Sequence, residues 1–219
     1  MLEDVWLVEL AKAFATGVLA GGASVVAHAL APAIRALRRA RAGDDERIER
    51  RLAAILIADV AGYSRLVAAD EEGTHLRLRA YQREILEPKV REHRGRIVKN
   101  TGDGALAEFS SVVDAVRCAL EVQGVLAARN APIPQSSRID FRIGINLGDV
   151  IVAPDDIYGH AVNVAARLES FAAPGGICLS HDAWCHVRGA IDAEFVDLGK
   201  RQLKNISEPT HVYAVAPVA

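Results

Sequence analysis

Two acidic residues lie where strands are expected to end, and their placement suggests metal chemistry. Asp59 follows the apolar run Leu52 to Ala58, and Asp103 lies in the tight Gly-Asp-Gly turn of the segment Lys99 to Gly104. No basic residue adjoins either carboxylate in the sequence, and small residues follow both. Carboxylates placed in this way hold hard cations such as Mg²⁺. Two of them suggest a two-metal site for phosphoryl transfer.

The expected ligand of such a site is a nucleoside triphosphate. Mg²⁺ takes one or two protein carboxylates and fills its other positions with phosphate oxygens. The small residues after Asp59, including Gly62, lead into a predicted helix whose first backbone N–H groups would face a triphosphate. The sequence contains no GxxxxGK[ST] motif, so this is not a P-loop. Aspartate is also a common turn residue, so the interpretation depends on the wider pattern.

Composition describes a globular protein with a small ligand. The chain has 219 residues, 51% of them hydrophobic, which suits one full core plus an appendage. Its formal net charge is -2, without a block of like charge long enough to follow a phosphate backbone, so nucleic acid is not an expected partner. An odd number of cysteines without CxxC spacing argues against a disulfide framework or a zinc ribbon and favours a reducing compartment: Cys118, Cys178 and Cys185.

Residues 1–42 predict a hydrophobic helix. The segment 14–34 has no charged side chain and is about long enough to span a bilayer once. Acidic residues precede it and arginines follow it, which by the positive-inside rule would anchor the chain at the inner membrane with the rest in the cytoplasm. Gly17 and Gly21 have the GxxxG spacing that lets two such helices approach closely. The run is rich in alanine and includes His28, so a soluble helix that packs on a partner stays open.

Residues 43–50 read as a linker, and residues 51–219 as a second domain with alternating strands and helices. Ser110 or Ser111 is expected to cap one helix, and Pro88 to disturb the end of another. A turn is expected at Gly148-Asp149. The predicted strands are 52–58, 95–100, 105–109, 138–147, 150–152 and 176–180, with a terminal strand pair in 195–216; the predicted helices are 70–90, 111–129, 159–170 and 182–188.

The order of the first six of these elements is βαββαβ, which predicts an α+β fold of the ferredoxin-like type. In that arrangement helices cover one face of an antiparallel sheet, and the other face is left for a ligand or a partner.

Three motifs in this order resemble the class III nucleotidyl cyclase catalytic domain, in its bacterial adenylate/guanylate branch. The resemblance covers about Arg51 to Val215. The motifs are IADVAGYS from Ile57 to Ser64, KNTGDG from Lys99 to Gly104, and DIYGHAVNVAARLE from Asp156 to Glu169.

The resemblance implies a reaction and the residues that perform it. Asp59, Val60 and Asp103 would bind two Mg²⁺ or Mn²⁺ ions. The ribose 3′-hydroxyl would attack the α-phosphorus in line, and pyrophosphate would leave. Arg167 would stabilise charge on the α-phosphate, and Asn163 would orient the ribose. These two residues are four apart on one predicted helix, so they face the same way.

The resemblance also implies contacts to the substrate. Gly62, Tyr63 and Lys204 match substrate-binding positions, although the residues around Lys204 depart from the family's usual glycine-rich form. Lys99 and Asp156 match the pair that selects adenine. Adenine has an acceptor at N1 and a donor at N6, so a lysine can donate to the first and an aspartate accept from the second. ATP is therefore expected rather than GTP.

In this family the metal aspartates and the base, ribose and arginine residues of one site come from different protomers. Because the chain holds both halves, the resemblance implies a head-to-tail homodimer with two composite sites. Two other readings stay open: a cyclase for another base, which would form cyclic GMP or a cyclic pyrimidine nucleotide, and a catalytically silent domain that binds nucleotide and signals through its N-terminal helix.

Overall fold

The computed structural model of the chain describes residues 48–215. The predicted helix over 1–42, its apolar segment 14–34 and residues 43–47 of the linker 43–50 lie outside the described residues. No helix among the described residues is long and apolar enough to cross a membrane.

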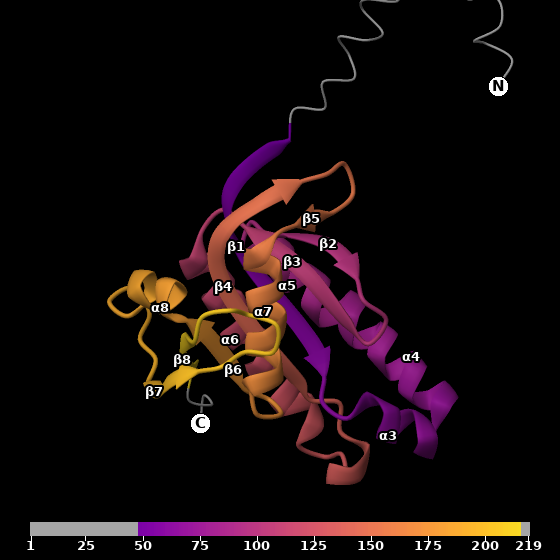
Figure 1. The fold of residues 1–219 in the computed structure, drawn as a ribbon. Coiled ribbons are helices and arrows are strands. Elements are labelled where there is room, and N and C mark those ends of the chain that lie inside the picture. Colours follow the sequence, from indigo (N-terminus) through magenta and orange to yellow (C-terminus); the bar gives the residue numbers. More distant parts are fainter. Residues whose placement is uncertain (1–47, 216–219) are drawn as a thin grey trace, which may run out of the picture. The chain divides into compact units, whose positions relative to one another are not determined.

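The described residues form a mixed eight-stranded sheet in the order β2-β3-β1-β4-β6-β8-β7, with β5 paired to β4. β4 and β6 run parallel, and the other neighbours are antiparallel (Figure 1). The strands are β1 (Glu49–Val60), β2 (Arg96–Asn100), β3 (Gly104–Phe109), β4 (Phe141–Val152), β5 (Ile157–Tyr158), β6 (Ile177–Ser180), β7 (Phe195–Arg201) and β8 (Thr210–Val215).

From Ala53 onward β1 is largely buried on both faces, which explains most of its apolar run; Leu52, at the start of that run, is exposed. Ala54, Leu56 and Ala58 point into the main core, whereas Ala53 and Ile55 point into a second core on the opposite face. The main core lies between the sheet and the helices α3 (Tyr63–Ala69), α4 (Glu71–Tyr81), α5 (Glu87–Glu92), α6 (Val112–Asn130) and α8 (His181–Val187). Ser111 caps α6 by accepting a hydrogen bond from the Asp114 N–H, as predicted.

The βαββαβ order is confirmed, but the second face of the sheet is not free. The helix α7 (His160–Phe171) lies over it, facing the viewer in Figure 1. Two glycines of β4 allow this close packing. A Cβ at Gly144 would lie 2.3 Å from the Ala165 carbonyl oxygen, and one at Gly148 would lie 2.7 Å from the Ala161 Cβ.

The turn predicted at Gly148-Asp149 is wrong. β4 runs without a break through both residues, which pair with Ala53 and Leu52 of β1. Gly148 lies at the contact with α7 instead. The prediction was wrong because a glycine that makes room for a helix gives the same signal in the sequence as one that makes a turn. The chain turns back only after Val152 and pairs there through β5.

Pro88 interrupts the predicted helix 70–90 without ending it. A π-helical turn over Gln82–Leu86 lies between α4 and α5, and the helix continues past Pro88 to Glu92. Proline lacks an N–H and its ring clashes with the carbonyl four residues earlier in an α-helix. The wider turn in front of Pro88 accommodates this conflict locally.

We predict that Gly144→Ala will lower the free energy of unfolding by about 2 kcal/mol or more, because the new methyl group collides with backbone atoms of α7 that cannot move independently. Denaturant unfolding measures this value. The matched control is Gly124→Ala in α6, where nothing lies within 4 Å of the new Cβ. Alanine there should raise stability by about 0.5 to 1 kcal/mol. Equal stability of the two variants would contradict the packing of α7 against β4.

Candidate active site

The register of β1 against β3 brings the two aspartates together. Asp59 pairs with Gly104, the residue after Asp103. Gly104 permits this approach, since a Cβ there would lie 2.2 Å from the Ala58 carbonyl oxygen. The Asp59 and Asp103 side chains are close enough to share a hydrogen bond. Residues 44 positions apart in the sequence, from 59 to 103, thus meet at one edge of the fold.

The electrostatics of Asp59 fit a cation-binding carboxylate. Burial raises the pKa of Asp59, and the negative charge of Asp103 raises it further, while Arg142 opposes both effects. Two carboxylates in contact repel each other when both are ionised, and a divalent cation between them relieves that repulsion. Val60 can add only its backbone carbonyl, because its side chain has no atom that binds a metal; that side chain is buried in the main core. The donor set therefore fits Mg²⁺ or Mn²⁺.

Arg142 is part of this group, and sequence analysis missed it. Asp59 has no basic neighbour in the sequence, but in the structure it pairs across the sheet with Arg142 of β4. Nη2 of Arg142 lies 3.3 Å from Oδ2 of Asp59, and its Nε lies 2.8 Å from Oε1 of Glu169 on α7. The signal for Arg142 is a cross-strand register, which one sequence does not display. Glu169 lies within the third motif, where no role was assigned to it.

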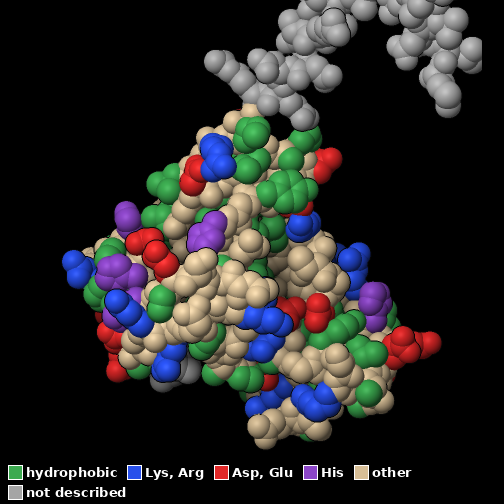
Figure 2. Space-filling model, in the orientation of Figure 1, with side chains coloured by type: hydrophobic (Ala, Val, Ile, Leu, Met, Phe, Trp, Pro, Cys, Tyr) green, Lys and Arg blue, Asp and Glu red, His purple; other side chains and the backbone are tan. Residues whose placement is uncertain are grey.

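Glu169 is a buried acid beside these charges. Only 6% of the Glu169 surface is exposed to solvent. Burial raises its pKa, Arg142 lowers it, and the charges of Asp59 and Asp103 raise it further. Two carboxylates, Asp59 and Glu169, therefore contact one guanidinium, and the charge of Asp103 acts on both of them. Figure 2 shows acidic and basic side chains side by side near the middle of the face on which α7 lies.

Lys99 and Asp156 form a second group. Their Nζ and Oδ2 atoms lie 2.5 Å apart, and Oδ1 of Asp156 accepts a hydrogen bond from the Ile157 N–H at 2.8 Å. A bulge between Ile97 and Lys99 in β2 precedes the lysine. Burial alone would raise the pKa of Asp156, but hydrogen bonds from Lys99, Ile157 and Tyr158 outweigh it and lower that pKa. The Lys99 ammonium also lies 5.8 Å from the centre of the Tyr158 ring.

Asn163 and Arg167 lie one turn apart on α7, Asn163 exposed and Arg167 partly buried. Nε of Arg167 donates a hydrogen bond to the Lys204 carbonyl oxygen at 3.1 Å. The structure thus brings Lys204 beside Arg167. Leu203 and Ile206 hold this loop in place because both are buried in a third apolar cluster. The Lys204 side chain itself is exposed.

Gly62 and Tyr63 lie where β1 leads into α3. Gly62 adopts a left-handed conformation, with φ of 69°. Tyr63 packs partly buried against the main core. A packing role therefore accounts for Tyr63, and its contact with a substrate stays a prediction.

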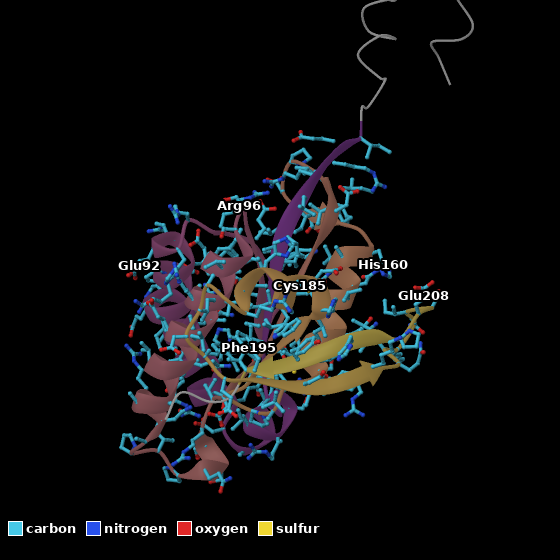
Figure 3. All side chains as sticks on the ribbon, turned by 90° about the vertical axis from the view of Figure 1, so that its left-hand side faces the viewer. Glu92, Arg96, His160, Cys185, Phe195 and Glu208 are labelled. Atoms are coloured by element: carbon cyan, nitrogen blue, oxygen red, sulfur yellow. The ribbon has the colours of Figure 1, made fainter. Side chains whose placement is uncertain are left out.

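The clearest cavity lies elsewhere. It measures about 550 Å³ and lies where β4 extends past β6, beside the start of α7. Its walls include Arg50, Asn146, His160, His181 and His211. Figure 3 labels His160 at the beginning of α7. None of the predicted site residues lines this cavity.

Comparison with known proteins gives the class. The family model of the adenylate and guanylate cyclase catalytic domain matches residues 49–216. The chain belongs to this family, which confirms the resemblance seen in its motifs. A crystal structure described as an adenylate/guanylate cyclase/hydrolase from Silicibacter pomeroyi is 45% identical and superposes with a TM-score of 0.74, covering 78% of this chain and 99% of that one.

Some of the other relatives are named as adenylate cyclases and some as guanylyl cyclases. The chain is 49% identical over 172 residues to the protein named "Putative adenylate cyclase 3" of Rhizobium meliloti; the match covers 78% of this chain but 29% of that relative. The chain therefore spans less than a third of it. A crystal structure of the guanylyl cyclase Cya2 is 26% identical, with a TM-score of 0.64 and coverage of 78% and 95%. A nucleotide cyclase domain is thereby shown, and the choice of base is not.

Proposed function

We propose that the chain is an adenylate cyclase, which converts ATP to 3′,5′-cyclic AMP and pyrophosphate at composite sites of a homodimer. The observation that carries the proposal is the Lys99–Asp156 pair, because it adds a reader of adenine to a domain of the cyclase family. Each of these two side chains is held by groups beyond the pair, so both are positioned before a base arrives.

The adenine-reading role follows from donor and acceptor chemistry. Lys99 donates to N1 of adenine, and Asp156 accepts from N6. The lowered pKa of Asp156 keeps it ionised, and therefore purely an acceptor, at neutral pH. Guanine presents a donor at N1 and an acceptor at O6. The Lys99 donor would then face a donor, and the Asp156 acceptor would face an acceptor.

Asp59 and Asp103, with the Val60 carbonyl, would hold two Mg²⁺ or Mn²⁺ ions, and the ions supply activation of the 3′-hydroxyl and neutralisation of the triphosphate charge. Asn163 orients the ribose. Arg167, steadied by its hydrogen bond to the Lys204 carbonyl, faces the α-phosphate with the rest of its guanidinium. The Lys204 ammonium and the backbone after Gly62 bind the terminal phosphates.

The two groups belong to different sites in this proposal. Among residues 48–215 no hydrogen bond or ion pair joins Asp59 or Asp103 to the Lys99–Asp156 pair. In a head-to-tail homodimer, Asp59 and Asp103 of one protomer would form one site with the Lys99–Asp156 pair of the other protomer. Inner-membrane anchoring through residues 14–34, with a cytoplasmic catalytic domain, stays a prediction.

The second candidate is a cyclase for another base, and the match to a guanylyl cyclase favours it. It keeps the same metal and arginine chemistry and changes only the nucleotide. A silent nucleotide-binding domain is less well supported, because Asp59 and Asp103 are in contact and Arg167 is held in place.

We expect the full chain to form cyclic AMP from MnATP and Asp59→Ala to lower kcat by at least about 100-fold, because a metal ligand is lost. Product formation measured by chromatography tests this. Asp192→Ala, which removes an exposed aspartate without an assigned role, is the control and should keep wild-type activity. Absence of any cyclic nucleotide at every protein concentration would contradict the proposal.

Base choice should follow the Lys99–Asp156 pair. We predict that Lys99→Glu combined with Asp156→Ser will shift the ratio of kcat/KM for GTP over ATP by at least about 10-fold, since one reversed base contact is worth 1–3 kcal/mol. Competition between the two nucleotides measures the ratio. Asp155→Ala changes the neighbouring exposed aspartate and should leave the ratio unchanged. A wild-type preference in the double variant would assign base selection to other residues.

The composite sites predict complementation between inactive variants. Asp103→Ala mixed with an equal amount of Arg167→Ala should recover about a quarter of wild-type activity, because half of the dimers are mixed and each holds one complete site. Asp103→Ala mixed with Asp59→Ala is the matched control. It should recover nothing, since both changes damage the same half. Equal activity of the two mixtures would speak against shared sites.

A further inference from the structure

Glu169 is a buried acid that the proposed reaction does not use. It lies on α7, and Oε1 of Glu169 is 2.8 Å from Nε of Arg142. Neither atom has a hydrogen-bond partner of good geometry, although both are buried. Nη2, the neighbouring nitrogen on the same edge of this guanidinium, lies 3.3 Å from Oδ2 of Asp59. Glu169 and Asp59 therefore share one guanidinium.

Backbone packing fixes Glu169 in this place. A Cβ on Gly144 would lie 2.3 Å from the Glu169 N, so the helix backbone rests directly on β4 at this residue. The Ser170 hydroxyl also lies 3.3 Å from Oε2 of Glu169. The carboxylate is thus held against Arg142 by the docking of α7, and its position does not depend on a flexible surface side chain.

Arg142 opposes cation binding at Asp59. A guanidinium keeps its charge at all accessible pH values, so it competes for the Asp59 carboxylate and repels a divalent ion next to it. A second carboxylate, Glu169, on the neighbouring nitrogen of the same guanidinium weakens both effects. It offers Arg142 another partner and cancels part of its charge.

We propose that Glu169 is a positioning residue for the metal site, which draws Arg142 away from Asp59 so that this carboxylate can bind the divalent cation. The inference rests on the proposed function only in assigning a metal to Asp59. The competing explanation is that Glu169 merely neutralises a buried arginine, in which case its loss would lower stability without changing cation affinity.

The test measures Mn²⁺ binding to the full chain without nucleotide, by electron paramagnetic resonance of the free ion. Glu169→Gln keeps the size of the side chain and removes its charge. We expect its Mn²⁺ dissociation constant to rise about tenfold, because Arg142 then keeps Asp59 as its charged partner and competes with the divalent ion. Excess Mn²⁺ should restore its cyclase activity. Wild-type affinity in a folded Glu169→Gln variant would overturn the inference.

A double-mutant cycle tests whether Glu169 acts through Arg142. Arg142→Met alone should bind Mn²⁺ at least as tightly as wild type, because a competing cation is gone. In that background Glu169→Gln should weaken binding less than about threefold, because the residue it positions is absent. An undiminished tenfold loss would mean a direct charge effect and would overturn the positioning role.

Stability and activity are followed separately. If Glu169→Gln fails to fold, Glu169→Asp is the second variant, because it keeps the charge but shortens the side chain. It should still raise the Mn²⁺ dissociation constant several-fold. In the Arg142→Met background the same change should have no such effect. Wild-type affinity in Glu169→Asp would then count against the inference. Mn²⁺ binding that depends on Asp59 without cyclic nucleotide formation would refute only the proposed function. Cyclase activity with unchanged Mn²⁺ affinity in Glu169→Gln would refute only the inference.

Discussion

The pairing of β1 with its two neighbours is the constraint on which the site depends. One residue, Asp59, lies opposite Gly104 of β3 and Arg142 of β4, so a single register places a second carboxylate and a guanidinium around it. Because side chains alternate between the faces of a sheet, a slip of one residue would turn Asp59 into the main core. The long apolar run of β1, buried on both faces, makes such a slip costly. Core packing therefore fixes the geometry of the charged site.

The docking of α7 is the second constraint, and it connects the two groups of site residues. The helix carries Asn163 and Arg167, which contacts the Lys204 loop, and it places Glu169 against Arg142 beside Asp59. Close packing at Gly144 leaves α7 little freedom to slide along β4. In the proposed homodimer these groups serve different active sites, so the helix would link one site to the other within each protomer. A shift of α7 would then disturb both sites together.

Much of the fold could be predicted from the sequence, because strands, helices and the Ser111 cap leave local signals in composition and spacing. The turn predicted at Gly148-Asp149 was wrong because a glycine signals a missing side chain without saying what occupies the space. Arg142 was missed for a related reason, since the register that sets it against Asp59 is decided by tertiary packing. The Lys99–Asp156 pair spans 57 positions and was found through family resemblance, since spacing alone would not join them.

The site charges are held in pairs that a substrate would have to exchange. Lys99 pairs with Asp156, and Arg142 pairs with Asp59. An unpaired charge in a partly buried site is costly, so these pairs stabilise the site. In the proposed reaction, adenine would replace the first pair because its N1 is an acceptor for Lys99 and its N6 a donor for Asp156. A base that satisfies only Lys99 or only Asp156 leaves the other charge unpaired. The free-energy cost of that unpaired charge would discriminate between nucleotides more than the strength of any new contact.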